Sequence, residues 1–256
     1  MNDQHLLYRV EDAVGMITIN REQQRNAITP EAIDLFHTYL DQAENDARVR
    51  ALLITGAGDK AFCTGAQLAG GMATEGKDIF GSYADLLDRL AGFSKPTVAR
   101  VKGYCLAGGM GFMLACDIVI AADDAKFGTP EVNVGLWPMM IGALIFRNVL
   151  RKKAMEMILL GERMTAREAL DMGLITRTAP ADGLDEEVNS VLKILVSKSP
   201  IGMRLGKQAF YEAADMPLKS ALIHLSEKLK EVVGTDDARE GITAFIEKRP
   251  PVFTGR

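Results

Sequence analysis

The chain has 256 residues, which is enough to bury a sizeable core as one large domain or as a domain with a small appendage. Hydrophobic residues make up 48%, charged residues 25%, and the formal net charge of −4 gives no general attraction for nucleic acid or an anionic membrane. The N-terminal segment lacks the flank and apolar core of a secretion signal, and no stretch approaches the ~20 apolar residues that span a bilayer, so we expect a cytoplasmic location.

The first predicted element is a strand over Val14 to Ile19, a β-branched, apolar run that ends at a polar stretch. A helix is predicted next, because Thr29 can cap it and Pro30 suits the first helical position. Apolar residues then recur at helical spacing. Ala51 to Thr55 is a second predicted strand, closed by a glycine-containing turn.

Two more strands are predicted over Thr97 to Val101 and Asp117 to Ala122, with the glycine-rich run LAGGMG between them. Strands that alternate with helical segments favour an α/β fold. From about residue 185 the pattern is helical throughout. We therefore expect an α/β core over residues 1–190 that contains the ligand site, and a helical C-terminal region over residues 191–256.

Two segments, Phe62 to Leu68 and Ala107 to Gly111, place small residues where backbone N–H groups can face a ligand. If Gly108 and Gly109 open a helix, their amides have no partner within it. Paired amides of this kind form an oxyanion hole, and loss of one donor typically costs ~3 kcal/mol of transition-state stabilisation. Glycine-rich turns also serve packing alone, so neither segment by itself decides the function. The dinucleotide and P-loop patterns are absent from the sequence.

Taken together, several longer stretches resemble the crotonase superfamily of enoyl-CoA hydratases and isomerases. They are ITINREQQRNAIT, ALLITGAGDKAFCTGAQL, KPTVARVKGYCLAGGMGFMLACDIVIAADDAKFGTPEVNVGL and LLGERMTAREALDMGLITRTAP, with a fainter echo at GITAFIEKRPPVF. The resemblance implies a spiral of ββα units followed by helices that mediate formation of a homotrimer, often as a dimer of trimers. It also implies an acyl-CoA substrate, with coenzyme A as part of the thioester and no separate cofactor.

The resemblance assigns the two oxyanion-hole amides to Ala66 and Gly108. The family's contacts with coenzyme A, largely through the main chain, fall on Arg25, Ala27, Thr64, Ala66 and Leu68. Gln67 stands where the family usually has an aspartate, which matters little if the amides rather than that side chain bind the ligand. The region of Phe245 and Lys248 is implied to approach the coenzyme A site of a neighbouring subunit.

Family hydratases use two glutamates, of which the second falls on Glu131 and the first on Gly111, which has no carboxylate. The implied catalytic set is therefore Glu131 with the amides of Ala66 and Gly108. A single carboxylate suits an isomerase that moves a proton between the α- and γ-carbons, whereas hydration also needs a group that orients water. Hydratases are the broader class in the family, so both reactions stay open.

Glu131 and the protein as a whole also allow other interpretations. A glutamate after Thr-Pro in a loop is often a solvated surface residue, whereas catalysis predicts an apolar pocket that raises its pKa. Gly111 also allows a non-catalytic acyl-CoA-binding protein, although an unpaired carboxylate would then bring little benefit. Thioester hydrolysis or decarboxylation on the same scaffold is a further alternative.

Several side chains carry secondary expectations. The run of Trp137, Met139, Met140 and Ile141 either lines an acyl pocket or packs in the core or a subunit interface. Asp117 is expected to form structural hydrogen bonds, and Arg100, within a predicted strand, needs a partner. We expect no metal site, disulfide framework or histidine catalysis from the remaining candidates, which are Cys63, Cys105, Cys116, His5, His37 and His224.

Overall fold

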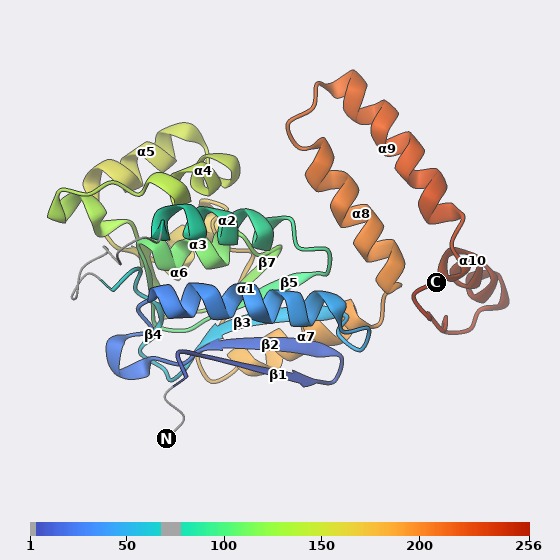
Figure 1. The fold of residues 1–256 in the computed structure, drawn as a ribbon, viewed down its shortest axis with the longest axis horizontal. Coiled ribbons are helices and arrows are strands. Elements are labelled where there is room, and N and C mark those ends of the chain that lie inside the picture. Colours follow the sequence, from blue (N-terminus) through green and yellow to red (C-terminus); the bar gives the residue numbers. More distant parts are fainter. Residues whose placement is uncertain (1–3, 68–77) are drawn as a thin grey trace.

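The computed structural model describes residues 4–67 and 78–256 (Figure 1). The larger sheet within them has six strands in the order β1-β2-β3-β5-β7-β10. β1 and β2 pair antiparallel through a turn at Asp12 and Ala13, and every other neighbouring pair in this sheet is parallel. The strands are β1 (Leu6–Glu11), β2 (Val14–Ile19), β3 (Ala51–Gly56), β5 (Thr97–Val101), β7 (Ile118–Ala122) and β10 (Arg177–Ala179).

A smaller sheet joins four short strands in the order β4-β6-β8-β9, which are β4 (Ala61–Cys63), β6 (Tyr104–Leu106), β8 (Lys126–Gly128) and β9 (Met164–Thr165). The chain alternates between the sheets, since β3 leads to β4, β5 to β6 and β7 to β8, each time before a helix. This repetition matches the expected spiral of ββα units. It brings the ends of β4, β6 and β8 side by side, where the site lies.

Helices cover both faces of the larger sheet (Figure 1). On one face, α1 (Pro30–Asn45), α2 (Ile79–Ala91) and α3 (Gly108–Leu114) contribute to the main hydrophobic cluster. On the other face, α7 (Leu184–Val196) packs Val188 and Val191 in a cluster with Leu53 and Val98 of the sheet. α7 therefore crosses the expected boundary at residue 190 and belongs by its packing to the sheet. The other helices of this part are η1 (Glu22–Gln24), η2 (Pro130–Val134), α4 (Met139–Asn148), α5 (Arg151–Leu160) and α6 (Ala166–Asp171).

Local chemistry explains where these elements begin. Thr29 Oγ1 accepts a hydrogen bond from Ala32 N at 3.1 Å, and Pro30 occupies the first helical position, as predicted. The strands over residues 14–19 and 97–101 also have their predicted bounds. Arg100, within β5, has the partner that it was expected to need, because its Nε lies 2.5 Å from Asp185 Oδ1 at the start of α7.

Three C-terminal helices form an arm that projects from the α/β core (Figure 1). They are α8 (Pro200–Ala213), α9 (Leu218–Val233) and α10 (Asp236–Glu247). The arm is fixed to the core at Asp117, whose Oδ2 accepts from Thr97 N at 2.7 Å and from Lys207 Nζ on α8 at 2.6 Å. Asp117 thus has the structural hydrogen-bonding role that was expected.

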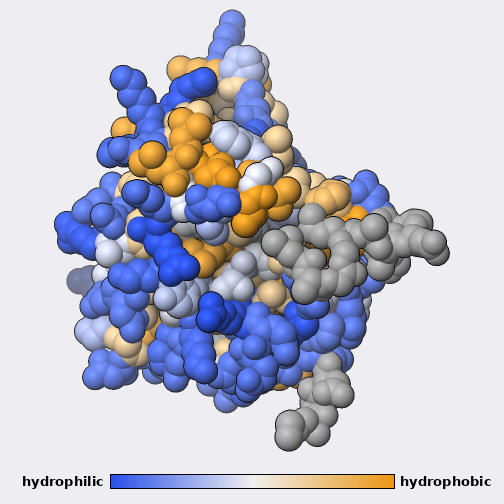
Figure 2. Space-filling view, turned by 90° about the vertical axis from the view of Figure 1, so that its left-hand side faces the viewer, coloured by the Kyte–Doolittle hydropathy of each residue, from blue (hydrophilic) through white to orange (hydrophobic). Residues whose placement is uncertain are grey.

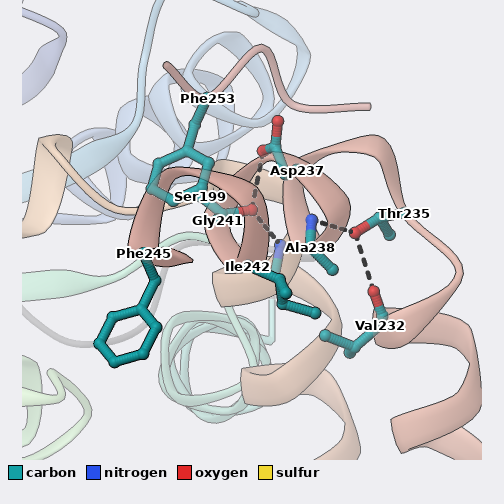
Figure 3. Close-up of a pocket in the computed structure, with 10 residues that line it drawn as sticks. Ser199, Val232, Thr235, Asp237, Ala238, Gly241, Ile242, Phe245 and Phe253 are labelled. Carbon is teal, nitrogen blue, oxygen red and sulfur yellow. Dashed lines mark hydrogen bonds between the residues drawn. The ribbon is translucent and has the colours of Figure 1, made fainter. Parts of the chain in front are cut away.

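The end of the chain folds back onto α10 around a buried carboxylate (Figure 3). Asp237 is 1% exposed and accepts hydrogen bonds from Ser199 Oγ at 2.7 Å, from Thr254 N at 2.7 Å and from Gly255 N at 3.1 Å. A shallow hollow of about 390 Å³ lies beside it, bordered by Phe245 and Phe253. Within the described part of the chain, no helix combines the length and apolarity that crossing a membrane requires.

Candidate active site

A cavity of about 480 Å³ opens between α1, α2, the start of α3, η2 and α4. Its lining is mostly apolar and includes Ile28, Ile33, Ile79, Phe80, Phe112, Val134, Leu136, Trp137, Met139, Met140 and Ile141. The run from Trp137 to Ile141 thus lines this cavity. The polar side chains in the lining are those of Thr29, Thr64, Gln67, Tyr83, Glu131 and Asn133. Among the described lining residues there is no lysine, arginine or histidine.

The first wall of interest is the loop after β4, where Ala66 forms a parallel β-bridge with Ile28. Ile28 N donates to Gly65 O at 2.8 Å, and Gln67 N donates to Ile28 O at 2.9 Å. Successive amides in an extended segment point to opposite sides, so the N–H of Ala66 points away from Ile28. Gly65 and Ala66 both line the cavity.

The second wall is the turn from β6 into α3. Gly108 is the first residue of α3, so its N–H has no partner within the helix. Gly65 packs directly against this turn, because a Cβ atom added to it would lie 2.9 Å from Ala107 Cβ and 3.3 Å from Gly108 N. The structure therefore brings Ala66 and Gly108, which lie far apart in the sequence, to neighbouring positions on the cavity wall.

Glu131 lies on η2 and lines the same cavity. Its Oε2 atom is buried and has no hydrogen-bond partner among the described residues. Burial raises the pKa of Glu131 above its ordinary value, and a backbone hydrogen bond opposes that rise. This is the environment that a proton-carrying carboxylate requires, since a raised pKa brings the group closer to the pH at which it must both accept and donate a proton.

Tyr83 on α2 is a site residue that sequence reasoning missed. Its hydroxyl donates to Gly108 O, and it lies beside Gly111, where an added Cβ atom would come within 2.3 Å of it. Burial raises the pKa of Tyr83 well above its ordinary value, with the nearby Cys63 and Glu131 adding to the shift. The glycine at position 111 was the available signal, because it leaves room for a side chain from elsewhere in the chain.

The residues predicted to contact coenzyme A are partly brought together. Thr64 lines the cavity and its Oγ1 donates to Arg25 O at 3.2 Å, so these two predicted residues are neighbours. Ala27 lies beside them, and its carbonyl accepts from Arg21 at 2.5 Å. Leu68 lies outside the described residues.

The structure adds one residue, Arg21, to the predicted coenzyme A segments and shows where the predicted Lys248 lies. Arg21, which sequence reasoning missed, also donates to Gln67 Oε1 at 2.7 Å and so ties the two predicted coenzyme A segments together. Lys248 ends α10 on the arm and does not line the cavity of its own chain.

The remaining candidate cysteines and histidines do not line the cavity. Cys63 and Cys105 are fully buried, and burial raises the pKa of the Cys63 thiol to about 12, so it stays protonated. His5 and His37 contact Thr29 Oγ1 and Ser82 O, and neither lines the cavity. No group of three or more histidine, cysteine or acidic side chains in residues 4–67 and 78–256 is arranged to hold a metal ion.

The sequence and the fold were compared with those of known proteins. The model of the enoyl-CoA hydratase/isomerase family matches residues 9–256. A probable enoyl-CoA hydratase of Mycobacterium bovis is 35% identical over 258 residues, covering 100% of both chains. The 2,3-dehydroadipyl-CoA hydratase of Escherichia coli is 32% identical and covers 98% of this chain and 99% of that protein. The crystal structure of an enoyl-CoA hydratase from Bacillus anthracis superposes with a TM-score of 0.94 at 29% identity, covering 99% of this chain and 100% of that one. The expected crotonase fold is thereby confirmed.

Proposed function

The chain belongs to the enoyl-CoA hydratase/isomerase family and is an enzyme that acts on an acyl-CoA, and we propose that it moves a proton on an enoyl-CoA thioester with one carboxylate, that of Glu131. The observation that carries the proposal is that Glu131 lines an apolar cavity while its buried Oε2 has no hydrogen-bond partner in the described chain. A desolvated, unpaired carboxylate is a stronger base than one in water. Such a group would be costly to keep in a protein that only binds.

The amides of Ala66 and Gly108 would bind the thioester oxygen. Removal of the α-proton by Glu131 shifts electrons onto that oxygen and forms an enolate. Because the two N–H donors are held by the fold before the charge develops, they stabilise the enolate without reorganisation, and each typically contributes ~3 kcal/mol. Glu131 then holds a proton that can exchange with solvent, and it returns a proton to carbon.

The reaction that this arrangement supports best is a shift of the double bond. In a 3-enoyl-CoA, Glu131 takes the α-proton, the negative charge spreads to the γ-carbon, and the same carboxyl group returns the proton there. Every step uses one group, and among the described residues Glu131 is the only carboxylate in the cavity lining. Hydration of a 2-enoyl-CoA is the second candidate, favoured by the names of the relatives as hydratases.

The lining also bears on the acyl group. Because the described lining contains no cationic side chain, a second carboxylate on the acyl chain would find no counter-charge there. Phe80, Trp137 and Met139 offer apolar surface instead. We therefore infer an uncharged, apolar acyl chain as the substrate, in contrast to the dicarboxylic substrate in the name of the Escherichia coli relative.

The test is to give the enzyme 3-hexenoyl-CoA and crotonyl-CoA separately and to follow the absorbance of the conjugated thioester. Growth of that absorbance with the first ester shows isomerisation, and its loss with the second shows hydration. Glu131→Gln should slow both by about 10²–10⁴-fold, whereas Glu186→Gln, at an exposed position on α7, should change neither. Release of free coenzyme A or carbon dioxide by the wild type would instead indicate hydrolysis or decarboxylation.

Assembly with other copies of the chain is part of the proposal. α9 has no buried residue, yet four apolar side chains recur on one side of it at helical spacing. They are Leu218, Leu222, Leu229 and Val233, each between 57% and 75% exposed. A further apolar patch lies in the upper half of the face shown in Figure 2, on the side where α4 and α5 lie. Exposed apolar surface of this kind marks interfaces, and we propose a homotrimer or a dimer of trimers, with Lys248 reaching a neighbour's coenzyme A.

A charge placed in the α9 stripe tests the assembly. Leu222→Asp should shift the mass measured by light scattering toward that of the monomer, because burying a carboxylate in an apolar interface is unfavourable. Ser220→Asp, on the opposite side of the same helix, is the matched control and should leave the mass unchanged. A wild-type chain that already runs as a monomer would rule the assembly out.

A further inference from the structure

The turn that presents Gly108 is strained. Ala107, the residue before α3, has φ 50° and ψ −140°, a backbone conformation that residues other than glycine rarely adopt. Holding a side-chain-bearing residue there costs on the order of 1–3 kcal/mol and persists only where the surroundings enforce it. Because Ala107 directly precedes the Gly108 amide, any relaxation of this residue would turn that N–H away from its present direction.

Two backbone hydrogen bonds hold Ala107 itself, because its N–H donates to Gly128 O at 2.9 Å and its carbonyl accepts from Met110 N at 2.9 Å. Tyr83 adds a side-chain contact to the same turn. The Tyr83 hydroxyl donates to Gly108 O, immediately after the strained residue. Its ring meets Phe112 edge-on with 5.7 Å between ring centroids, and Phe112 in turn stacks on Phe36 of α1 at 4.9 Å. The phenol is thus fixed at its ring end by the core and at its hydroxyl end by the start of α3.

Gly111 makes this contact possible. A Cβ atom at position 111 would lie 2.3 Å from the Tyr83 hydroxyl and 2.9 Å from Ile141 Cγ2, so any larger residue would push the phenol away. The glycine one turn into α3 and the tyrosine of α2 therefore form a matched pair. Because burial keeps the Tyr83 hydroxyl protonated, it serves as a hydrogen-bond donor and not as a base.

We propose that Tyr83 is a positioning residue that locks the strained Ala107–Gly108 turn through its hydrogen bond to Gly108 O, so that the Gly108 amide stays aimed at the thioester oxygen. The proposal rests on the proposed function insofar as Gly108 is taken to bind that oxygen. It assigns to Gly111 the role of making room for the phenol.

The first test is Tyr83→Phe, which keeps the ring and its contact with Phe112 but removes the hydroxyl. Turnover should fall at least about tenfold, less than the 10²–10³-fold expected when an oxyanion donor is lost outright, while KM changes little. Gly111→Ala should reproduce this loss by displacing the hydroxyl. Gly206→Ala, where an added Cβ atom meets nothing within 4 Å, is the matched control and should retain wild-type turnover.

The decisive test combines Tyr83→Phe with Ala107→Gly. Glycine adopts the conformation of residue 107 without strain, so the turn no longer needs the lock. The loss caused by Tyr83→Phe should therefore shrink to about threefold or less in the Ala107→Gly background. An equal loss in both backgrounds would show that Tyr83 does not act through this turn and would overturn the proposal.

A spectroscopic readout separates this proposal from the proposed function. The carbonyl stretch of bound butyryl-CoA, which has no double bond to hydrate or move, should lie at lower frequency than that of the free ester in the wild type. In Tyr83→Phe the frequency should shift part of the way back toward that of the free ester. In the double variant with Ala107→Gly it should again match that of the wild-type complex. If the wild type isomerises nothing yet shows this pattern, only the proposed reaction fails. An unchanged stretch in Tyr83→Phe would contradict the positioning role.

Discussion

The cavity and the C-terminal arm each contain one carboxylate with a buried oxygen, and the surroundings of the two are opposite. Glu131 in the cavity has an oxygen with no hydrogen-bond partner in the described chain, and burial raises its pKa. Asp237 in the arm is also buried, but the donors Ser199, Thr254 and Gly255 outweigh that burial and lower its pKa. The fold therefore gives both oxygens of Asp237 hydrogen-bond donors and leaves one oxygen of Glu131 without a donor in the described chain.

The difference in hydrogen bonding suits Asp237 to a structural role and Glu131 to a chemical one. Hydrogen bonds to a carboxylate favour its charged form and fix the groups that donate them, which suits a residue that ties the chain end to α10. The same bonds would weaken a base, because a carboxylate that is already stabilised has little tendency to take a proton. Leaving an oxygen of Glu131 without a donor lowers the stability of the fold, but it keeps the carboxylate basic at the place where a substrate would bind.

The largest expected effect is on activity. Glu131→Gln should lower turnover by about 10²–10⁴-fold, the usual contribution of a positioned acid or base. The variant should nevertheless unfold at the same or a higher temperature at pH 7, since an amide replaces a desolvated charge. Thermal melting and steady-state rates of the same preparation check both statements. If Glu131→Gln is less stable than the wild type and fully active, Glu131 has a structural role and not a catalytic one.

A smaller effect, on stability, is expected in the arm. Asp237→Ala should lower the free energy of unfolding by ~1–3 kcal/mol, because it leaves Ser199 Oγ and the amides of Thr254 and Gly255 without their acceptor. Asp236→Ala removes the exposed neighbour, whose ion pair with Arg239 is worth ~0–1 kcal/mol. Chemical denaturation compares the two variants. Equal losses would show that burial of Asp237 brings no special stability.

The smallest effect is on how stability depends on pH, and its sign differs between the regions. The raised pKa of Glu131 means that its contribution is present below its ordinary value of 4.5 and is lost as pH rises through the raised value. The lowered pKa of Asp237 means that its contribution is present above its ordinary value of 3.8 and is lost as pH falls. The melting temperature of Glu131→Gln should therefore decline less than that of the wild type as pH rises from 4.5 through the raised pKa of Glu131. That of Asp237→Asn should decline less as pH falls below 3.8. Parallel profiles for all three proteins would contradict this assignment.

The sequence predicted those parts of the molecule whose signals are local. The strand over residues 14–19 and the helix capped by Thr29 follow from adjacent residues, and both are confirmed. The small-residue segments around Ala66 and Gly108 were likewise recognisable, and in the structure both line the same cavity. The exposed stripe of α9 is also a local pattern, although only the structure shows that its own chain leaves it uncovered.

The parts that the sequence did not predict depend on distance along the chain. The strands of the smaller sheet have two or three residues each, too few for an alternating pattern to be recognised. Tyr83 meets Gly108 across 25 positions and carries no motif of its own. Arg21 joins Gln67 across 46 positions in the same way. Contacts of this kind follow from the spiral of strands and helices and become visible only in three dimensions.

If Glu131 removes the α-proton of a bound thioester, the hydrogen at that carbon should exchange with solvent. Butyryl-CoA would be incubated in deuterium oxide with the wild type and with Glu131→Gln, and deuterium at the α-carbon followed by mass spectrometry. The wild type should incorporate deuterium, and the variant should incorporate none above background. Incorporation at equal rates by both proteins would show that another group moves the proton, and would contradict the role proposed for Glu131.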